Sequence, residues 1–197
     1  SGTTGKPKGV MLTHNNIIFN VMAAREITPL QAYTRSLTFL PPCHAYERMV
    51  IYTYMYIGIT TYIAESLDKI GSNIKEAQPH IMTAVPRILE KVYEKIMKTG
   101  HELSGSKRKI FDWAVSVGEA YDPNPANRSF AYNLKLKLAK KLVLDKWYEA
   151  LGGHLVTVAS GSASLQNKLA RIFLAAGIPL YEGYGMTEAS PLISVNH

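Results

Sequence analysis

The chain opens on Ser1-Gly2-Thr3-Thr4-Gly5-Lys6-Pro7-Lys8-Gly9, and the apolar run Val10-Met11-Leu12 follows directly. Glycines let backbone N–H groups turn toward one point, hydroxyl groups add donors and lysine adds positive charge, which together suit a loop that holds a polyphosphate. The alternative is a flexible linker, although linkers rarely place a proline between two lysines and run straight into apolar residues. The common nucleotide loop has wider glycine spacing and a hydroxyl residue directly after its lysine, where this chain has Pro7. The stretch therefore predicts a phosphate loop of another kind.

The bulk composition is that of a globular protein. A chain of 197 residues is long enough for one sizeable domain or two small ones, and 47% apolar with 19% charged residues argues against disorder. The net charge of +7 indicates an anionic partner, for which nucleotides, phosphates, nucleic acids and lipid surfaces all qualify. The single cysteine, Cys43, excludes an internal disulfide and fits a reducing compartment.

Neither end of the chain looks like a natural terminus. No secretory signal is visible at the start. The longest uncharged run, residues 49–64, falls short of the roughly 20 residues that span a bilayer, and it reads as a buried helix turning into a buried strand. The chain starts within a motif and stops at Val195-Asn196-His197 without a helix end or a polar tail. We therefore expect a piece of a larger protein.

Helices and strands alternate over the first half of the chain. Helical spacing of Ile17, Ile18, Val21 and Met22 predicts a helix over residues 11–25, with His14-Asn15 at its N-cap. Further helices are expected over residues 44–56, 70–77 and 86–98, and strands over residues 36–40, 60–64 and 80–84. Such alternation implies a parallel sheet.

The alternation is interrupted by a helical excursion at about residues 100–151. Two helices, residues 106–120 and 129–151, flank the proline-containing turn at residues 121–125. The second helix interleaves leucines with lysines (Leu134, Leu138, Leu142, Lys135, Lys137, Lys140, Lys141 and Lys146). A basic amphipathic helix can lie on a membrane or on nucleic acid, and a solvated surface helix is the more common alternative. We expect the pair to pack outside the sheet.

The alternation resumes after Gly152-Gly153. A strand over residues 154–159, a turn at 160–163, a helix over 165–176 ended by Gly177, and a strand over 178–181 are expected, followed by a loop at 182–188. Loops after parallel strands are where such sheets bind ligands. The expected fold is α/β, a mostly parallel sheet flanked by helices, with a nucleotide-sized cleft at these loops.

The last loop contains Tyr184-Gly185-Met186-Thr187-Glu188, in which several binding groups lie close together. The ring can stack on a purine, Thr187 can donate to a phosphate oxygen, and Glu188 can hold Mg²⁺. Alone, a tyrosine beside a glycine in a turn is usually structural. Its combination with the opening stretch is more specific.

The opening stretch resembles the phosphate loop of the AMP-forming, acyl-adenylate-forming enzymes, and residues 184–188 resemble their second signature. Three further stretches are similar to long-chain fatty-acyl-CoA synthetases: Leu40-Pro41-Pro42-Cys43-His44-Ala45-Tyr46-Glu47-Arg48, Val85-Pro86-Arg87-Ile88-Leu89-Glu90-Lys91-Val92-Tyr93, and Gly152-Gly153-His154 through Ser160-Gly161-Ser162-Ala163. The helical excursion also resembles an insertion of that subgroup. The resemblance covers essentially all 197 residues and implies an incomplete AMP-binding N-terminal domain.

The resemblance implies a two-step ligase. A fatty carboxylate attacks the α-phosphate of ATP, giving acyl-AMP and pyrophosphate, and the CoA thiol then displaces AMP, with Mg²⁺ as the metal. Thr187, at the α-phosphate, and Glu188, on Mg²⁺, would be the catalytic residues, and His44 would lie near the acyl carboxylate, with the apolar run after it along the acyl tunnel. The remaining implied contacts are those with the β- and γ-phosphates (Ser1, Gly2, Thr3, Thr4, Gly5 and Lys8) and with adenine (Gly161, Ser162 and Ala163 on one wall, Gly183 and Tyr184 on the other).

Simpler interpretations remain open beside these roles. His44 could cap the helix that starts there, and His44 with Glu47 could ligate a metal, although two ligands make no site. Ser164 stands where the family has proline, and the hydroxyl residue that precedes the family's loop is missing before Ser1. The ribose-binding aspartate, the hinge and the C-terminal domain with the adenylation lysine are also missing. We therefore expect the chain by itself to lack measurable synthetase activity.

Three functional readings follow. The leading one is a long-chain fatty-acid–CoA ligase fragment, cytoplasmic, acting on a fatty acid, ATP and CoA, with peripheral membrane contact and oligomeric state left open. The second is an acyl-adenylating enzyme for another carboxylic acid. The third is a non-catalytic module that binds a nucleotide, nucleic acid or anionic lipid. No nucleic-acid motif is evident, so we expect no nucleic-acid partner.

Overall fold

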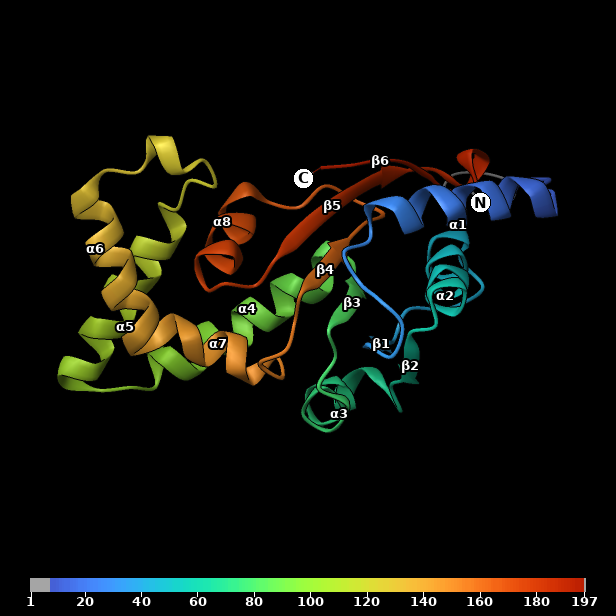
Figure 1. The fold of residues 1–197 in the computed structure, drawn as a ribbon. Helices are drawn as coiled ribbons and strands as arrows, with labels where there is room; N and C mark the ends of the chain where they lie inside the picture. The colour runs from blue at the N-terminus through green and yellow to red at the C-terminus, as the bar shows by residue number, and fades with distance from the viewer. Residues whose placement is uncertain (1–7, 197) are drawn as a thin grey trace.

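The computed structural model describes residues 8–196, which form a six-stranded sheet with helices on both faces (Figure 1). The strand order is β2-β1-β3-β4-β5-β6, and all neighbours pair in parallel except β5 and β6. The strands are β1 (Arg35–Thr38), β2 (Thr60–Ile63), β3 (Ile81–Ala84), β4 (Thr157–Ser160), β5 (Leu180–Gly185) and β6 (Leu192–Val195). The expected α/β fold with a mostly parallel sheet is confirmed.

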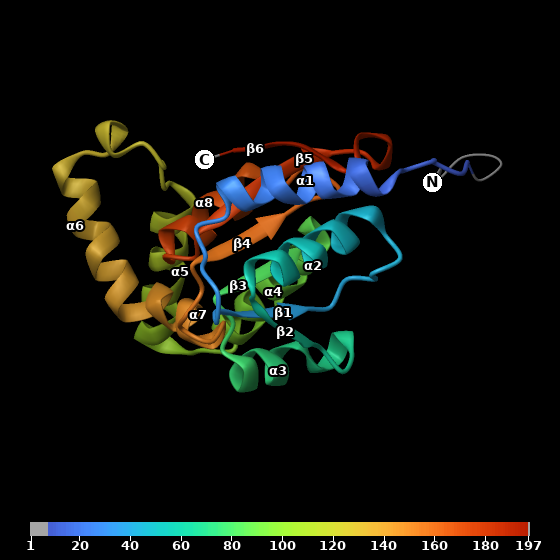
Figure 2. The ribbon, with the colours of Figure 1, turned by 45° about the vertical axis from the view of Figure 1, so that its right-hand side comes forward.

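Two groups of helices cover the two faces of the sheet (Figure 2). The helices are α1 (His14–Ile27), α2 (Ala45–Ile57), α3 (Ile70–Ala77), α4 (Pro86–His101), α5 (Gly105–Glu119), α6 (Phe130–Ala139), the π-helix η3 (Lys140–Leu144), α7 (Asp145–Ala150) and α8 (Asn167–Ala175). Short 3-10 turns are η1 (Leu67–Lys69), η2 (Pro125–Asn127) and η4 (Thr187–Ala189). Helices α1 and α2 pack on one face, and α4 and α8 on the other.

The alternation of side chains along the central strands separates two apolar cores. Met82 of β3 and Val158 of β4 join the larger core, which includes α4, α5 and α8. Ile81 points the other way and joins the smaller core with residues of α1 and α2, such as Val21 and Met49. Strand β3 therefore supplies both cores by its period of two.

The helical excursion extends the larger core beyond the edge of the sheet (Figure 1). Trp147 of α7 packs edge-on against Tyr93 of α4 and Phe173 of α8, with ring centroids 6.3 and 6.4 Å apart. Tyr132 of α6 donates a hydrogen bond of 2.8 Å to the carbonyl of Val117 in α5. The expected excursion outside the sheet is confirmed, although the second predicted helix contains the π-helical turn η3.

Several expected boundaries were wrong. Thr13, rather than His14-Asn15, caps α1, and it forms a capping box with Asn16. Strand β5 continues through Gly185 instead of ending near Tyr181, because β6, which the sequence pattern did not predict, pairs with it. Strand β6 is only four residues long and follows a proline, which leaves little periodic signal.

Within residues 8–196, none of the helices is both long enough and apolar enough to cross a bilayer.

Candidate active site

The opening loop is described only from Lys8 onward. The predicted phosphate contacts Ser1, Gly2, Thr3, Thr4 and Gly5 lie outside the described residues. Lys8 is exposed and lies five residues before Thr13, the N-cap of α1. The loop therefore leads directly into α1.

Helix α1 connects this end of the chain with the second signature. Asn20, which is buried on the inner side of α1, donates through Nδ2 to the carbonyl of Leu192 at 2.9 Å and accepts from the Leu192 amide at 2.9 Å. These two hydrogen bonds satisfy the backbone amide and carbonyl of Leu192 in β6, as a neighbouring strand would do. Asn20 and Leu192 are 172 residues apart in the chain, so this side chain joins α1 to the β5–β6 hairpin.

The second signature lies on the β5–β6 hairpin rather than in an open loop. Gly183 and Tyr184 are strand residues paired with Val195 and Ser194, which corrects the expected loop at residues 182–188. A Cβ at Gly185 would lie 2.0 Å from the carbonyl oxygen of Pro191, so only glycine fits there. Thr187 and Glu188 then form the single turn η4.

The turn after β4 approaches this hairpin from the neighbouring strand. The Gly161 amide donates to the carbonyl of Ala84 at 3.2 Å, and a Cβ on Gly161 would lie 2.9 Å from the Tyr46 ring. The carboxylate of Glu182 in β5 accepts from the Leu165 amide at 3.0 Å. This bond holds the two predicted adenine walls at a fixed separation.

A cavity of about 470 Å³ opens where these segments meet. Among the predicted residues, those that line it are His44, Ser162, Gly183, Tyr184 and Thr187. Gly161 is buried behind it against Tyr46, while Ala163, Glu188 and Lys8 are exposed and do not line it. The structure thus brings together five of the predicted residues from α2, the turn after β4, β5 and η4.

The N-terminal end of α2 forms part of the wall of this cavity. His44 occupies the N-cap position, but its side chain makes no capping hydrogen bond. Glu47 is fully buried and accepts hydrogen bonds from the Thr38 hydroxyl and, at 2.9 Å, from the Thr83 hydroxyl. His44 is exposed, whereas the Glu47 side chain is buried between α2 and the sheet, so the two do not form a metal pair.

Burial controls the titration of the groups around Glu47. Desolvation raises the pKa of the Glu47 carboxyl, although the hydrogen bonds from Thr38 and Thr83 act in the opposite direction. Burial, and secondly the charge of Glu47, raises the pKa of the Tyr46 hydroxyl. The Tyr46 hydroxyl donates to the carbonyl of Ala159 at 3.2 Å. Burial thus shifts the pKa of both groups in the direction of their neutral forms.

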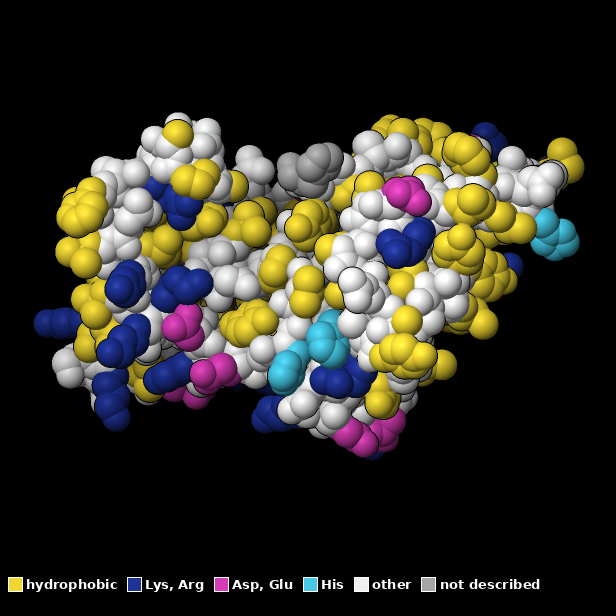
Figure 3. Space-filling model, in the orientation of Figure 1, with side chains coloured by type: hydrophobic (Ala, Val, Ile, Leu, Met, Phe, Trp, Pro, Cys, Tyr) yellow, Lys and Arg dark blue, Asp and Glu magenta, His cyan; other side chains and the backbone are white. Residues whose placement is uncertain are grey.

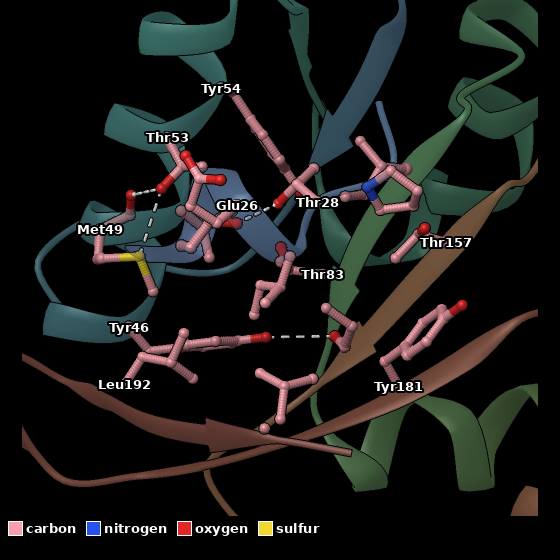
Figure 4. A pocket seen from close by; sticks show the side chains of 18 of the residues that line it. Glu26, Thr28, Tyr46, Met49, Thr53, Tyr54, Thr83, Thr157, Tyr181 and Leu192 are labelled. Carbon is pink, nitrogen blue, oxygen red and sulfur yellow. Dashed lines mark hydrogen bonds between the residues drawn. The ribbon is translucent and has the colours of Figure 1, made fainter. Parts of the chain in front are cut away.

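A second cavity of about 410 Å³ lies between α1, α2 and the sheet (Figure 4). Its walls are mostly apolar, with Ala24, Met49, Val50 and Ile81 among them. The residues Tyr46, Gly183 and Leu192 line both cavities. We call the cavity of about 470 Å³ the strand-end cavity and the cavity of about 410 Å³ the apolar cavity. The two cavities therefore share a wall.

The described residues contain no cluster of three or more His, Cys, Asp or Glu side chains that could hold a metal ion. Glu188 is a single exposed carboxylate on η4, next to Thr187. Mg²⁺ is commonly bound by one or two carboxylates together with substrate phosphates. The donor set therefore fits a magnesium ion that arrives with a phosphate, and not a cage made by protein alone.

Three structural contributions were not identified from the sequence. Asn20 gives a signal, because it is the single polar residue within the apolar run at residues 17–24. Glu47 gives a similar signal, because it is a charged residue just before the uncharged run at residues 49–64. Its threonine partners, however, come from two strands that are distant in the sequence. The shared position of Tyr46 between two cavities has no sequence signal.

Comparison with known proteins matches the whole chain to one family. The family model described as AMP-binding enzyme matches residues 1–197. A long-chain-fatty-acid–CoA ligase from Xenopus laevis is 38% identical over 201 residues, which cover 96% of this chain and 27% of that protein.

Two solved structures have a similar fold. The long-chain-fatty-acid–CoA ligase FadD1 from Archaeoglobus fulgidus matches with a TM-score of 0.64 and 19% identity, over 100% of this chain and 32% of its own. The o-succinylbenzoate CoA synthetase from Bacillus subtilis, in complex with ATP and a magnesium ion, matches with a TM-score of 0.62 and 18% identity, over 100% and 31%. The chain thus spans about a third or less of the length of these proteins.

Proposed function

The chain belongs to the AMP-binding enzyme family, and we propose that it forms the ATP- and acid-binding part of a long-chain fatty-acid–CoA ligase. In the first step a fatty carboxylate oxygen attacks the α-phosphorus of ATP. The bond from this phosphorus to the bridging oxygen breaks, and pyrophosphate leaves with its electron pair. In the second step the CoA thiolate attacks the acyl carbon and AMP leaves. A cytoplasmic protein with access to ATP and CoA suits this reaction.

The observation that carries the proposal is the shared wall between the two cavities. The strand-end cavity contains polar groups from His44, Ser162 and Thr187, whereas the cavity behind Tyr46 is lined mainly by apolar side chains. An acid with a long alkyl chain needs both environments, because its carboxylate reacts among polar groups while its chain gains from leaving water. The volumes lie in the range of small-molecule sites.

We assign roles first to the residues that line the strand-end cavity and then to the opening loop. The Thr187 hydroxyl would donate to an α-phosphate oxygen, and the Tyr184 ring would stack on adenine, with Ser162 on the opposite side. The opening loop, including Lys8, would hold the β- and γ-phosphates. His44 would orient the fatty carboxylate beside the α-phosphate. Together these contacts would place two anions in line for attack, which is the main demand of phosphoryl chemistry.

Glu188 would hold Mg²⁺ together with the nucleotide phosphates. The ion would supply positive charge at the phosphate oxygens when bound. Glu188 is exposed and forms no hydrogen bond within residues 8–196, so its carboxylate can turn toward a bound phosphate. The role of this chain would be to present the carboxylate on the single turn η4, beside Thr187.

A binding experiment tests the nucleotide and acid sites on the chain itself. We would titrate it by calorimetry with non-hydrolysable acyl-adenylate analogues that carry acetyl, octanoyl or palmitoyl groups. Affinity should rise strongly with chain length, because each buried methylene contributes about 0.8 kcal/mol. Ala24→Phe, which projects into the apolar cavity, should remove this gain and leave acetyl-adenylate binding unchanged. Equal affinity across the series would instead favour another carboxylic acid.

An activity experiment tests the metal assignment on the longer protein that contains this chain. Glu188→Ala should lower acyl-CoA formation by at least about 100-fold, comparable to the loss of one transition-state contact. Glu94→Ala on α4, another exposed glutamate, serves as the matched control and should retain full activity. Unchanged activity in the Glu188 variant would exclude its role on Mg²⁺. Nucleotide binding without any acyl-CoA formation by the unmodified protein would indicate a non-catalytic module.

A further inference from the structure

We propose that the outer face of α6 and η3 is a docking surface for an anionic lipid membrane. This surface, which we call the basic stripe, consists of Phe130, Leu134, Leu138 and Leu142 with the exposed lysines Lys135, Lys137 and Lys141. The proposal concerns a region away from both cavities and does not depend on the proposed reaction.

The apolar residues of the basic stripe are all exposed. The exposed fractions are 87% for Phe130, 62% for Leu134, 51% for Leu138 and 39% for Leu142. Within α6, Phe130, Leu134 and Leu138 recur every fourth residue, which is slightly more than one helical turn, so they form one slowly winding row about 12 Å long. Leu142 follows in η3. A row of this kind costs free energy in water unless something covers it.

The inner face of the same helix is already fully engaged. Leu136, Ala139 and Leu144 are buried in the larger core, and Tyr132 is hydrogen-bonded to Val117 in α5. Both faces of the helix are therefore apolar, but only the inner one has a partner within residues 8–196. The outer row is not needed to hold the helix on the protein.

Lysines border the apolar row on both sides. Within α6, at 100° per residue, Lys137 falls next to Phe130 on one side of the row, and Lys135 falls beyond Leu138 on the other. Lys141 follows in η3 and is also exposed. Asp145 is the only acidic residue between positions 129 and 148. Among the described residues, these three lysines form no ion pair. Figure 3 shows dark-blue and yellow side chains intermingled along the left edge, over α6.

This combination fits an anionic lipid surface better than nucleic acid. Helices that lie in a membrane interface bury an apolar face at the acyl boundary while flanking lysines reach the head groups. Each lysine near an anionic leaflet contributes about fivefold to the partition coefficient. A surface that binds nucleic acid would also use lysines, but it would stack the bases on aromatic side chains and would not need a row of leucines.

A matched comparison is available on the other side of the molecule. Phe19 of α1 is 74% exposed, but residues 10–24 contain no charged side chain. Yellow side chains with few dark-blue ones cover this region at the right of Figure 3. Phe19→Ser therefore removes an exposed aromatic ring without changing the basic stripe.

The experiment is co-sedimentation of the longer protein that contains this chain with phosphatidylcholine vesicles, with and without phosphatidylserine, at low and high salt. We expect binding only to the phosphatidylserine vesicles, weakening as salt rises. Lys137→Glu with Lys141→Glu should lower the partition coefficient more than tenfold, and Phe130→Ser about tenfold. The control substitutions Phe19→Ser and Lys95→Glu on α4 should each leave the partition coefficient unchanged.

Several outcomes would overturn the proposal. These are no binding to phosphatidylserine vesicles, equal binding to neutral vesicles, or an equal loss from Phe19→Ser. Binding to single-stranded RNA that survives Phe130→Ser, without binding to vesicles, would identify a nucleic-acid surface instead. Far-UV circular dichroism of each variant separates lost binding from lost folding.

Discussion

The two faces of the sheet differ in what they bury. The face covered by α4, α5 and α8 is packed with apolar side chains, including Phe111, Trp147 and Phe173. The face covered by α1 and α2 has the smaller apolar core and also buries Asn20 and Glu47, both with hydrogen-bonded side chains. The apolar cavity of about 410 Å³ lies on this second face.

The two faces therefore contribute differently to the stability of the fold and to the candidate site. Burying polar groups and leaving an empty cavity both cost stability, so a face that does both depends on a well-packed one elsewhere. The face with α4 and α8 supplies that stability, and the face with α1 and α2 supplies the site. Substitutions on the two faces should accordingly affect different measurements.

The largest effect is expected from the well-packed face. Phe173 is fully buried and packs edge-on against Trp147. Phe173→Ala should lower the free energy of unfolding by about 3–5 kcal/mol, because it removes apolar contacts and leaves a void. Urea denaturation measures this change. The folded fraction should still bind a palmitoyl-adenylate analogue with unchanged affinity, and a weaker affinity would contradict the separation of the two faces.

The next effect concerns the hairpin that carries the second signature. Gly185→Ala places a Cβ against the Pro191 carbonyl, so the β5–β6 hairpin must open. The expected loss is about 1–3 kcal/mol in unfolding free energy, with weaker nucleotide binding because η4 is displaced. Gly71→Ala in α3 is the control, since its Cβ would meet no neighbouring atom. Nucleotide affinity equal to that of the control variant would show that η4 does not contact the nucleotide.

The sequence predicted the well-packed face better than the site face. Repeating helix and strand patterns gave the parallel sheet and the helical excursion, because apolar periodicity reports burial directly. The hairpin was missed, since the pairing of β5 with β6 depends on a short segment completed by Asn20 from far away in the chain. The meeting of Ser162 with Tyr184 and Thr187 followed from loops at strand ends, whereas His44 was indicated only by the family resemblance. The Glu47 contacts could not be predicted, because they join three separate elements.

Asn20 offers a finer test of how the site face is held together. Asn20→Ala leaves both backbone groups of Leu192 without their partner and should cost about 1–3 kcal/mol in unfolding free energy. Asn20→Asp keeps the acceptor for the Leu192 amide but loses the donor to its carbonyl. Hydrogen exchange at the Leu192 amide should therefore be fast in the alanine variant and slow in the aspartate variant. Equal exchange in the two would mean that Asn20 does not hold β6.

The smallest expected effect, visible as a pH dependence, comes from Glu47. Burial raises the pKa of this carboxyl above its ordinary value of 4.5, so the folded state keeps a proton that the unfolded chain releases. Its contribution to stability is therefore complete below pH 4.5 and is lost as the pH rises through the raised pKa, with a slope of at most about 1.4 kcal/mol per pH unit.

Glu47→Gln should remove this slope, since glutamine stays neutral and can still bond to Thr38 and Thr83. The measurement is the difference in unfolding free energy between the two proteins across the acid and neutral range, which cancels the other titrating groups. Phe173→Ala provides the comparison between the faces, because it should lower stability equally at every pH and keep the slope. A slope that survives in Glu47→Gln would assign the pH dependence to a group other than the one buried beneath the site.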